Sequence, residues 1–429
     1  MIQTLKNAWK IPELKSKLLF TLLIVLLYRL GASIPVPYID AAAMEGVSAL
    51  STGFLQYLNI MSGSAFAQAT LFALSVSPYI TASIVIQLLT VAIPALERWS
   101  KDGEEGRKKI SALTRVVTVA LALVTSYGYM NIISSPSVGI LNAEGFFEKL
   151  IVVLCYCAGA SLIMWLAEKI NERGIGNGIS IILFANILSG GWNMVLGVVQ
   201  MITGAKHLAV GIILGVVSIA ITLAFVVLVV LVTNSERRIP IQYAKRVVGR
   251  KMYGGQNTNL PIKINMSGVM PIIFASSIVS IPATIQAFFP DAKLLQWVNN
   301  YFSYDSWIYL VINLLLIVAF SYFYIMISFN PVEVANNIKN NGGAIPGVRT
   351  GKPTVDFINK ILGRITFIGA IFLCIVAGFP MLINILFGGN FTGLAFGGNS
   401  LLIVVGVALE TVRELEAQIT MRNYKGFLD

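Results

Sequence analysis

The stretch LAVGIILGVVSIAITLAFVVLVVLV, residues 208–232, decides what class of protein this chain forms. It contains no charged residue, and its only hydroxyl side chains are those of Ser218 and Thr222. As a helix rising about 1.5 Å per residue it would extend about 37 Å, which is enough to cross a hydrocarbon core of about 30 Å. The stretch therefore predicts a membrane-spanning helix.

The rest of the chain has the same character. Of its 429 residues, 56% are hydrophobic and 12% are charged, whereas a soluble domain has about 25% charged residues. So few charges cannot cover a globule, which means that lipid solvates much of the chain. A tenth apolar segment begins at Gly398 but stays purely apolar only to Leu409. Nine others are long enough to span: 18–34, 69–93, 110–133, 150–166, 179–201, 208–232, 266–289, 306–329 and 361–387.

The number of lysine and arginine residues alternates strictly between high and low along the segments that join these spans. With ten spans, 26 of the 31 lie on one side and three on the other. Because positive residues concentrate in cytoplasmic loops, both termini are predicted to be cytoplasmic and the tenth helix to be a span. Arg29, toward the outer end of the first span, either snorkels or pairs with backbone carbonyls inside the bundle, and snorkelling is the favoured interpretation.

Several functional classes lack the residues they need. One histidine, His207, and three cysteines, Cys155, Cys157 and Cys374, cannot build a metal cage or a disulfide framework, so no metal or cofactor is expected. The motifs G-x-S-x-G and H-E-x-x-H are absent from the sequence, so we expect no enzyme. A ten-helix secondary transporter of a small solute stays as the alternative, although the spans offer no mid-membrane acidic site.

A short segment after the first span, residues 53–64, is unusual for an outer loop. Its apolar residues recur at i, i+3, i+4 and i+7, which is one face of a short helix. The helix is either interfacial and re-entrant or a movable element that folds back into the bundle, and the sequence leaves both open. These apolar residues are Phe54, Tyr57, Leu58 and Met61.

Two long basic loops project on the predicted cytoplasmic side. In the loop 233–265, Ile239, Ile241 and Tyr243 alternate before a turn signal at Gly254-Gly255, which predicts a protruding β-hairpin. The second loop, 328–364, is also basic and has a turn-rich centre. The charges are either a topology signal or a surface for an acidic partner such as ribosomal RNA or an acidic protein face.

Five ordered stretches together resemble a known family. They are Ile34-Pro35-Val36-Pro37, Ser77-Pro78-Tyr79-Ile80-Thr81-Ala82-Ser83-Ile84, Glu172-Arg173-Gly174-Ile175-Gly176-Asn177-Gly178-Ile179-Ser180, Tyr243-Ala244-Lys245-Arg246 and Phe329-Asn330-Pro331. The chain resembles the SecY family, the central subunits of the bacterial protein-conducting channel, over essentially its whole length.

This resemblance implies an all-α polytopic membrane protein of ten transmembrane helices. Two inverted five-helix halves, residues 1–205 and 206–429, would form a clam shell around a pore in the cytoplasmic membrane. Unfolded secretory polypeptides would cross through the pore, and membrane helices would leave it sideways into lipid. An apolar ring that fits an extended chain and resists ion flow would form the constriction. The implied ring residues are Val76, Ile80, Leu183, Ile273, Ser277 and Ile403.

The resemblance also assigns the moving parts and the partners. A plug would close the outer funnel, formed by 53–64 with Gly53, Phe54, Tyr57, Leu58, Met61 and Ser64. A lateral gate between the second and seventh spans would include Thr81, Gln87 and Ile281. The motor ATPase SecA and the ribosome would contact Lys245, Arg246, Arg250, Lys251 and Arg349. SecE and SecG would be the small membrane subunits, and signal sequences and nascent membrane helices the clients. Leu183 and Ile281 depart from the family pattern, which commonly has isoleucine and an aromatic residue there.

Overall fold

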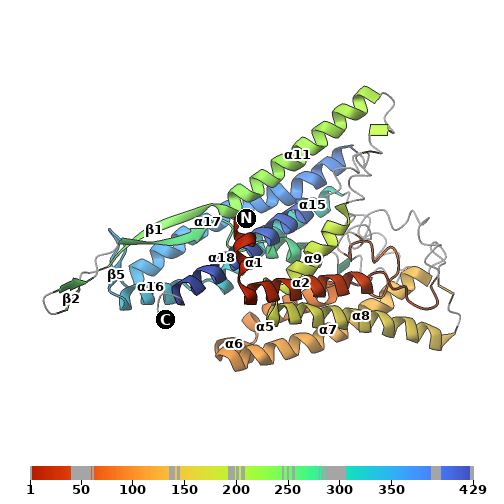
Figure 1. Ribbon diagram of the computed structural model, residues 1–429, viewed down its shortest axis with the longest axis horizontal. Helices are drawn as coiled ribbons and strands as arrows, with labels where there is room; N and C mark the ends of the chain where they lie inside the picture. Colours follow the sequence, from red (N-terminus) through yellow and green to blue (C-terminus); the bar gives the residue numbers. More distant parts are fainter. Residues whose placement is uncertain are drawn as a thin grey trace.

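The computed structural model describes residues 2–39, 59, 62–134, 141–142, 145–191, 199, 202–203, 208–243, 246–248, 251–253, 257–279, 281–282, 285, 306–387 and 398–425. The chain is mostly helical, and each of the ten predicted spans contains a described helix. Figure 1 shows α2, α7 and α8 in one layer and α11, α15 and α17 in another. Helices α9 and α18 lie between the layers and contact each other.

The part of the chain before residue 190 forms seven of the described helices. Helix α5 meets α6 at an angle of 102° across Ile93, because Pro94 begins a new helix there. The elements are α1 (Ile2–Lys10), α2 (Pro12–Gly31), α5 (Ser77–Ala92), α6 (Pro94–Lys101), α7 (Gly103–Ser134), α8 (Phe146–Arg173) and α9 (Gly178–Ser189).

The second part of the chain contains the longest described helix, α17, and the five named strands. These elements are α11 (Leu208–Asn234), β1 (Glu236–Tyr243), β2 (Arg246–Val248), β3 (Lys251–Tyr253), β4 (Asn257–Lys263), α12 (Met270–Val279), α15 (Trp307–Ser328), α16 (Pro331–Asn340), β5 (Gly343–Ala344), α17 (Lys352–Phe387) and α18 (Gly398–Lys425).

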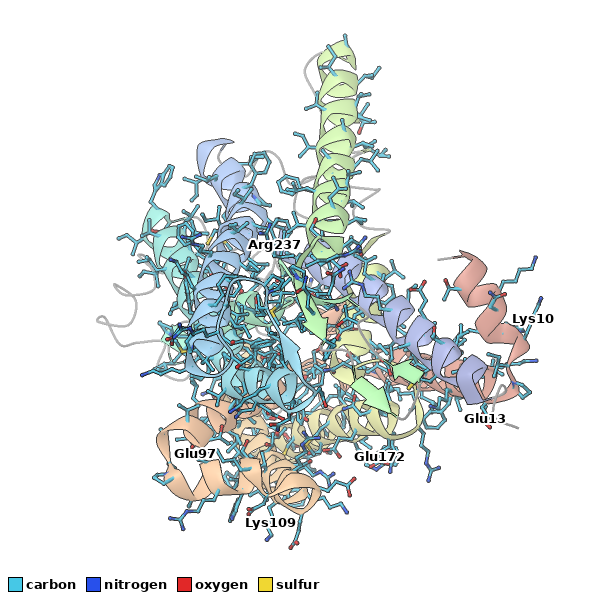
Figure 2. The ribbon with its side chains drawn as sticks, turned by 90° about the vertical axis from the view of Figure 1, so that its left-hand side faces the viewer. Lys10, Glu13, Glu97, Lys109, Glu172 and Arg237 are labelled. Carbon is cyan, nitrogen blue, oxygen red and sulfur yellow. The ribbon has the colours of Figure 1, made fainter. Side chains whose placement is uncertain are left out.

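Length and composition alone qualify five helices of the described chain as membrane spans, or six if the bent pair α5 and α6 is one span. Helix α11 is the most apolar of them and the least covered by protein. Ile213, Val216 and Leu223 on it are each about 60% exposed, and Figure 2 shows the helix projecting from the bundle. Such a surface is stable only where lipid replaces protein as its neighbour. The fold is therefore that of a multi-pass membrane protein.

The second predicted span begins later than expected, and its predicted start at residue 69 is wrong. Helix α5 begins at Ser77, and residues 62–76, which we call the stem, form successive turns instead. The stem is apolar because it is buried in protein, where Phe66, Ala69 and Ala73 pack against α7 and α8. A hydropathy pattern cannot separate this kind of burial from exposure to lipid.

The predicted β-hairpin is present, and it is larger than the sequence indicated. Strand β1 pairs with β4 in antiparallel register from Glu236↔Lys263 to Gln242↔Asn257, and β5 of the second loop adds to the other edge of β1. The tip reverses between Val248 and Lys251, because β2 pairs with β3 there. The turn predicted at 254–255 falls outside the described residues. Figure 1 shows the ribbon extending from one end of the bundle.

Candidate functional site

The predicted ring residues come from four helices, and the structure brings most of them together. Val76 caps the N-terminus of α5, where Pro78 in the first turn fixes the entry of the chain. Leu183 lies on α9, Ile273 on α12 and Ile403 on α18. These four side chains are between 1% and 8% exposed and belong to one buried apolar cluster. Their proximity comes from packing between segments that are 90 or more residues apart.

The two remaining ring residues lie at the margin of this cluster. Ile80 is partly buried and packs against it one turn along α5. The hydroxyl of Ser277 donates to the carbonyl of Ile273 at 2.8 Å, which satisfies it within α12. Apart from Ser277, the predicted ring side chains are therefore all aliphatic. Separating these side chains would expose apolar area at a cost of about 1.5 to 3 kcal/mol for each one fully uncovered.

The predicted lateral gate lies along α5 and α12, which are in contact. Thr81 donates to the carbonyl of Ser77 at 3.1 Å, and Gln87 donates to the hydroxyl of Ser83 at 3.3 Å. Both hydrogen bonds stay within α5 and do not cross to α12. Ile281 lies just beyond the end of α12 and is 44% exposed. Apolar contact is thus the main attraction across this seam that the described residues show.

Most of the predicted plug falls outside the described residues. Gly53, Phe54, Tyr57, Leu58 and Met61 are among those positions, whereas Ser64 is described. Ser64 begins a well-bonded region in which its amide donates to the carbonyl of Asn59 at 2.9 Å. The structure therefore describes the attachment of the predicted plug, which is the stem.

Two buried tyrosines that the sequence analysis did not single out hold the stem. The hydroxyl of Tyr129 on α7 donates to the carbonyl of Phe66, and that of Tyr156 on α8 donates to the carbonyl of Ala69 at 3.3 Å. The two rings contact each other edge to face. A tyrosine in an apolar span needs a hydrogen-bond partner for its hydroxyl. The presence of these tyrosines in the sequence therefore indicates that each hydroxyl has a buried partner. The partner itself is not readable from the sequence.

The favoured interpretation of Arg29 is wrong. Its guanidinium Nη2 donates to the carbonyl of Ala185 at 2.7 Å and to that of Asn186 at 3.4 Å, both on α9. The side chain is partly buried between α2 and α9. The alternative of pairing with backbone carbonyls inside the bundle is therefore confirmed, because both bonds go to carbonyls of a neighbouring helix.

Strand β1 of the basic ribbon is exposed at its start and half-buried further along. Ile239 and Ile241 of β1 are buried against α16 and α17, whereas Arg237 and Arg238 are exposed. Figure 2 shows Arg237 beside the base of α11, where β1 begins. The alternation thus turns one face of the strand to protein and the other to solvent.

The predicted partner contacts lie on and beside this ribbon. Arg246 and Lys251 are in the paired strands β2 and β3, and their side chains are not described. Lys245 and Arg250 lie outside the described residues. Arg349 is exposed, and its carbonyl accepts a hydrogen bond from the hydroxyl of Thr354 at 2.8 Å. That bond orders the backbone before α17.

The base of the ribbon is tied to α18. Arg413 donates to the carbonyl of Thr233 at 2.8 Å and to the side chain of Asn234 at 2.7 Å, at the C-terminal end of α11. A cation there also suits the helix dipole. Burial and the nearby Arg413 lower the pKa of Lys263, against the opposing effect of Glu410. This cluster was not predicted, because it joins residues 180 positions apart.

Among the described residues, no group of three or more His, Cys, Asp or Glu side chains is placed to hold a metal ion. The three cysteines are free thiols. The described residues show a buried apolar cluster shared by α5, α9, α12 and α18, the stem that leads into α5, and a basic ribbon at one end of the bundle.

These features define a multi-pass α-helical membrane protein. The chain belongs to the SecY family, whose model matches residues 70–412. It is 43% identical over 441 residues to the protein translocase subunit SecY of Streptomyces galbus, and 40% identical over 436 residues to that of Bacillus subtilis. Each comparison covers the whole of this chain and the whole of the relative.

Solved structures share the fold at lower identity. A structure described as that of a protein conducting channel has a TM-score of 0.64 at 19% identity, covering 94% of this chain and 92% of its own. Sec61 in a canine ribosome-channel complex from the endoplasmic reticulum has a TM-score of 0.60 at 17% identity, with the same coverages. The chain is thus a protein-translocating channel subunit and not a small-solute transporter.

Proposed function

We propose that unfolded polypeptides cross the membrane through the apolar cluster where α5, α9, α12 and α18 meet. The observation that carries this is that Val76 and Leu183 from the first half of the chain share one buried cluster with Ile273 and Ile403 from the second half. A soft aliphatic ring can close around any extended sequence and excludes ions when it is dewetted. Ile80 and Ser277 complete the ring in this proposal, and translocation itself involves no catalysis by this chain.

The two halves, 1–205 and 206–429, would separate along α5 and α12 to admit signal sequences and release nascent membrane helices into lipid. The absence of cross-seam hydrogen bonds from Thr81 and Gln87 supports an inexpensive opening. Segment 53–64 would act as the plug. Both termini would face the cytoplasm of a cytoplasmic membrane, in accord with the alternating Lys and Arg counts.

The ribbon and the second loop would form the docking surface for SecA and for the ribosome, through Lys245, Arg246, Arg250, Lys251 and Arg349. Exposed Arg237 and Arg238 on the same ribbon add to a positive field. An acidic partner such as ribosomal RNA is attracted by such a field. SecE and SecG would be the small membrane subunits of the complex.

Disulfide trapping tests the path. The native cysteines are replaced by alanine, Ile273→Cys is introduced, and a secretory chain with one cysteine is stalled during export. We expect a crosslink that depends on the stalled chain. Ile317→Cys is the matched control, because Ile317 is fully buried in the same cluster but lies on α15, which contributes no residue to the proposed ring. Equal crosslinking at both positions, or none at Ile273 in an export-active variant, would move the path elsewhere.

Charge reversal tests the docking surface. Replacing Lys245, Arg246, Arg250 and Lys251 by Glu should reduce sedimentation of the channel with SecA and with ribosomes, most strongly at low salt. The matched control reverses four charges at the corner of α6 and α7, namely Arg98, Lys101, Arg107 and Lys108. Equal loss in both variants would mean that net charge alone, and not the ribbon, governs binding.

A further inference from the structure

Arg29 is an arginine inside a predicted span whose role the channel function leaves unexplained. A cation in a span is costly unless it has partners. Its partners here are the carbonyls of Ala185 and Asn186 near the C-terminal end of α9, which carries the negative end of a helix dipole. The arginine thus joins α2 to α9.

The stem packs on the same place. A Cβ built on Gly63 would lie 2.8 Å from the hydroxyl of Ser189, 2.9 Å from the carbonyl of Asn186 and 3.0 Å from Nη2 of Arg29. Only a hydrogen fits in that space, and the φ of Gly63 is +64°. The backbone of the stem is therefore pressed directly against the pairing of Arg29 with α9.

The other end of the stem reaches the same helix. The side-chain amide of Asn186 donates to the hydroxyl of Ser75 at 3.1 Å, and both residues are buried. Ser75 directly precedes Val76, the first residue of the proposed ring. One turn of α9 thus touches the stem both at its plug-side end and at its ring-side end.

The stem is held in a conformation that the isolated backbone disfavours. Ser64, Ala69 and Ser75 have φ values of +72°, +45° and +50°, although none is a glycine. Residues of this kind persist in the left-handed region only when their surroundings fix them, and they concentrate in segments that switch. The surroundings here are the tyrosine hydroxyls of α7 and α8 and the polar contacts with α9.

We propose that Arg29 is a positioning residue that fastens the stem to α9 and so keeps the plug side and Val76 in register in the resting channel. Its guanidinium binds the carbonyl of Asn186, against which Gly63 packs. Without it, the strained stem relaxes away from α9 and the constriction loosens without a translocating chain. This inference rests on the proposed ring and plug, and it adds the residue that regulates them.

Arg29→Gln removes the charge while keeping an amide donor. Losing a hydrogen bond to a charged group shifts such an equilibrium by about 10-fold to 100-fold. We expect the resting ion conductance of the purified channel in planar bilayers to rise by about that factor, and cells to export a reporter whose signal sequence is disabled. Arg29→Lys keeps the charge but not the fork of donors, so it should give an intermediate increase.

Arg115→Gln is the matched control. Arg115 also lies in a predicted span and donates to Glu168 at 2.7 Å, the same distance as from Arg29 to Ala185. It joins α7 to α8 and does not touch the stem. A purely structural role for Arg29 would lower thermal stability in both variants and leave resting conductance unchanged in both, which would overturn the proposal.

Gly63→Ala approaches the contact from the other side. It leaves Arg29 in place and pushes the stem away from α9, so it should reproduce the leak even if Arg29→Gln does not accumulate in the membrane. The crosslink at Ile273 separates the two levels of inference. A crosslink with no leak in either variant refutes the role of Arg29 alone, whereas a leak without any crosslink refutes the ring.

Discussion

Gly159→Ala tests how tightly the stem is packed. Gly159 lies in α8, and a Cβ added there would lie 2.0 Å from the carbonyl oxygen of Leu71 in the stem. Ordinary contact begins at 3.4 Å, so the two segments must move apart by about 1.4 Å. The stem cannot yield freely, because the amide of Leu71 donates to the carbonyl of Ile34 at 2.9 Å.

The magnitude follows from two opposing terms. Inserting a methyl group into a well-packed core costs about 1 to 3 kcal/mol. Replacing a helical glycine by alanine gains up to about 1 kcal/mol. Because the clash is with backbone rather than with a flexible side chain, we take the upper part of the cost. We expect a net loss of about 1 to 2 kcal/mol.

Thermal unfolding of the detergent-purified protein measures this loss. Gly363→Ala on α17 is the matched control, because a Cβ there would meet nothing within 4 Å. The control should be as stable as the parent or more stable, since only the helix propensity changes. Gly159→Ala should unfold at a lower temperature than both. If Gly159→Ala and Gly363→Ala unfolded together, the close packing of α8 on the stem would be refuted.

Two further predictions concern elements that position the ring and the ribbon. Arg413→Ala should lower the free energy of unfolding by about 1 kcal/mol. It should also accelerate amide hydrogen exchange in β1 and β4 but not in α7. Unchanged exchange in β1 would show that the ribbon is not tied to α18. Asn177 caps α9 and Asn330 caps α16, and each side chain accepts hydrogen bonds from the backbone amides two and three residues further along. Replacing either by Ala should lower the free energy of unfolding by about 1 kcal/mol. Exchange should rise in α9 only for Asn177→Ala, and a rise in both helices for either variant would contradict local capping.

Hydropathy and charge alternation predict where the chain crosses the membrane. Each of the ten predicted spans contains a helix, because lipid selects long apolar helices by one physical criterion. The same criterion misplaces the start of the second span, because residues 69–76 are apolar for burial under Tyr129 and Tyr156 rather than for contact with lipid. A hydropathy pattern reports that a side chain avoids water and does not say what covers it.

Contacts between distant segments are the part that the sequence does not disclose. Period-two alternation predicts β1, but the addition of β5 depends on a pairing of Gln242 with Ala344 that no local pattern encodes. The charge of Arg29 is visible in the sequence, yet its carbonyl partners on α9 follow only from how α2 packs. The six ring residues are assigned from the family resemblance. Without it, their sequence pattern predicts only that they are buried apolar residues.

The three-stranded sheet β4-β1-β5 has a practical consequence for anyone who labels this protein. The sheet joins the two basic loops into one structural unit. A fluorophore or an antibody fragment on either loop therefore reports the movement of both. Substitutions in the two loops share a partner strand, and their effects on binding should not add. A load applied to β5 reaches α11 through β1, so a tether on the second loop pulls on both helices that carry the sheet.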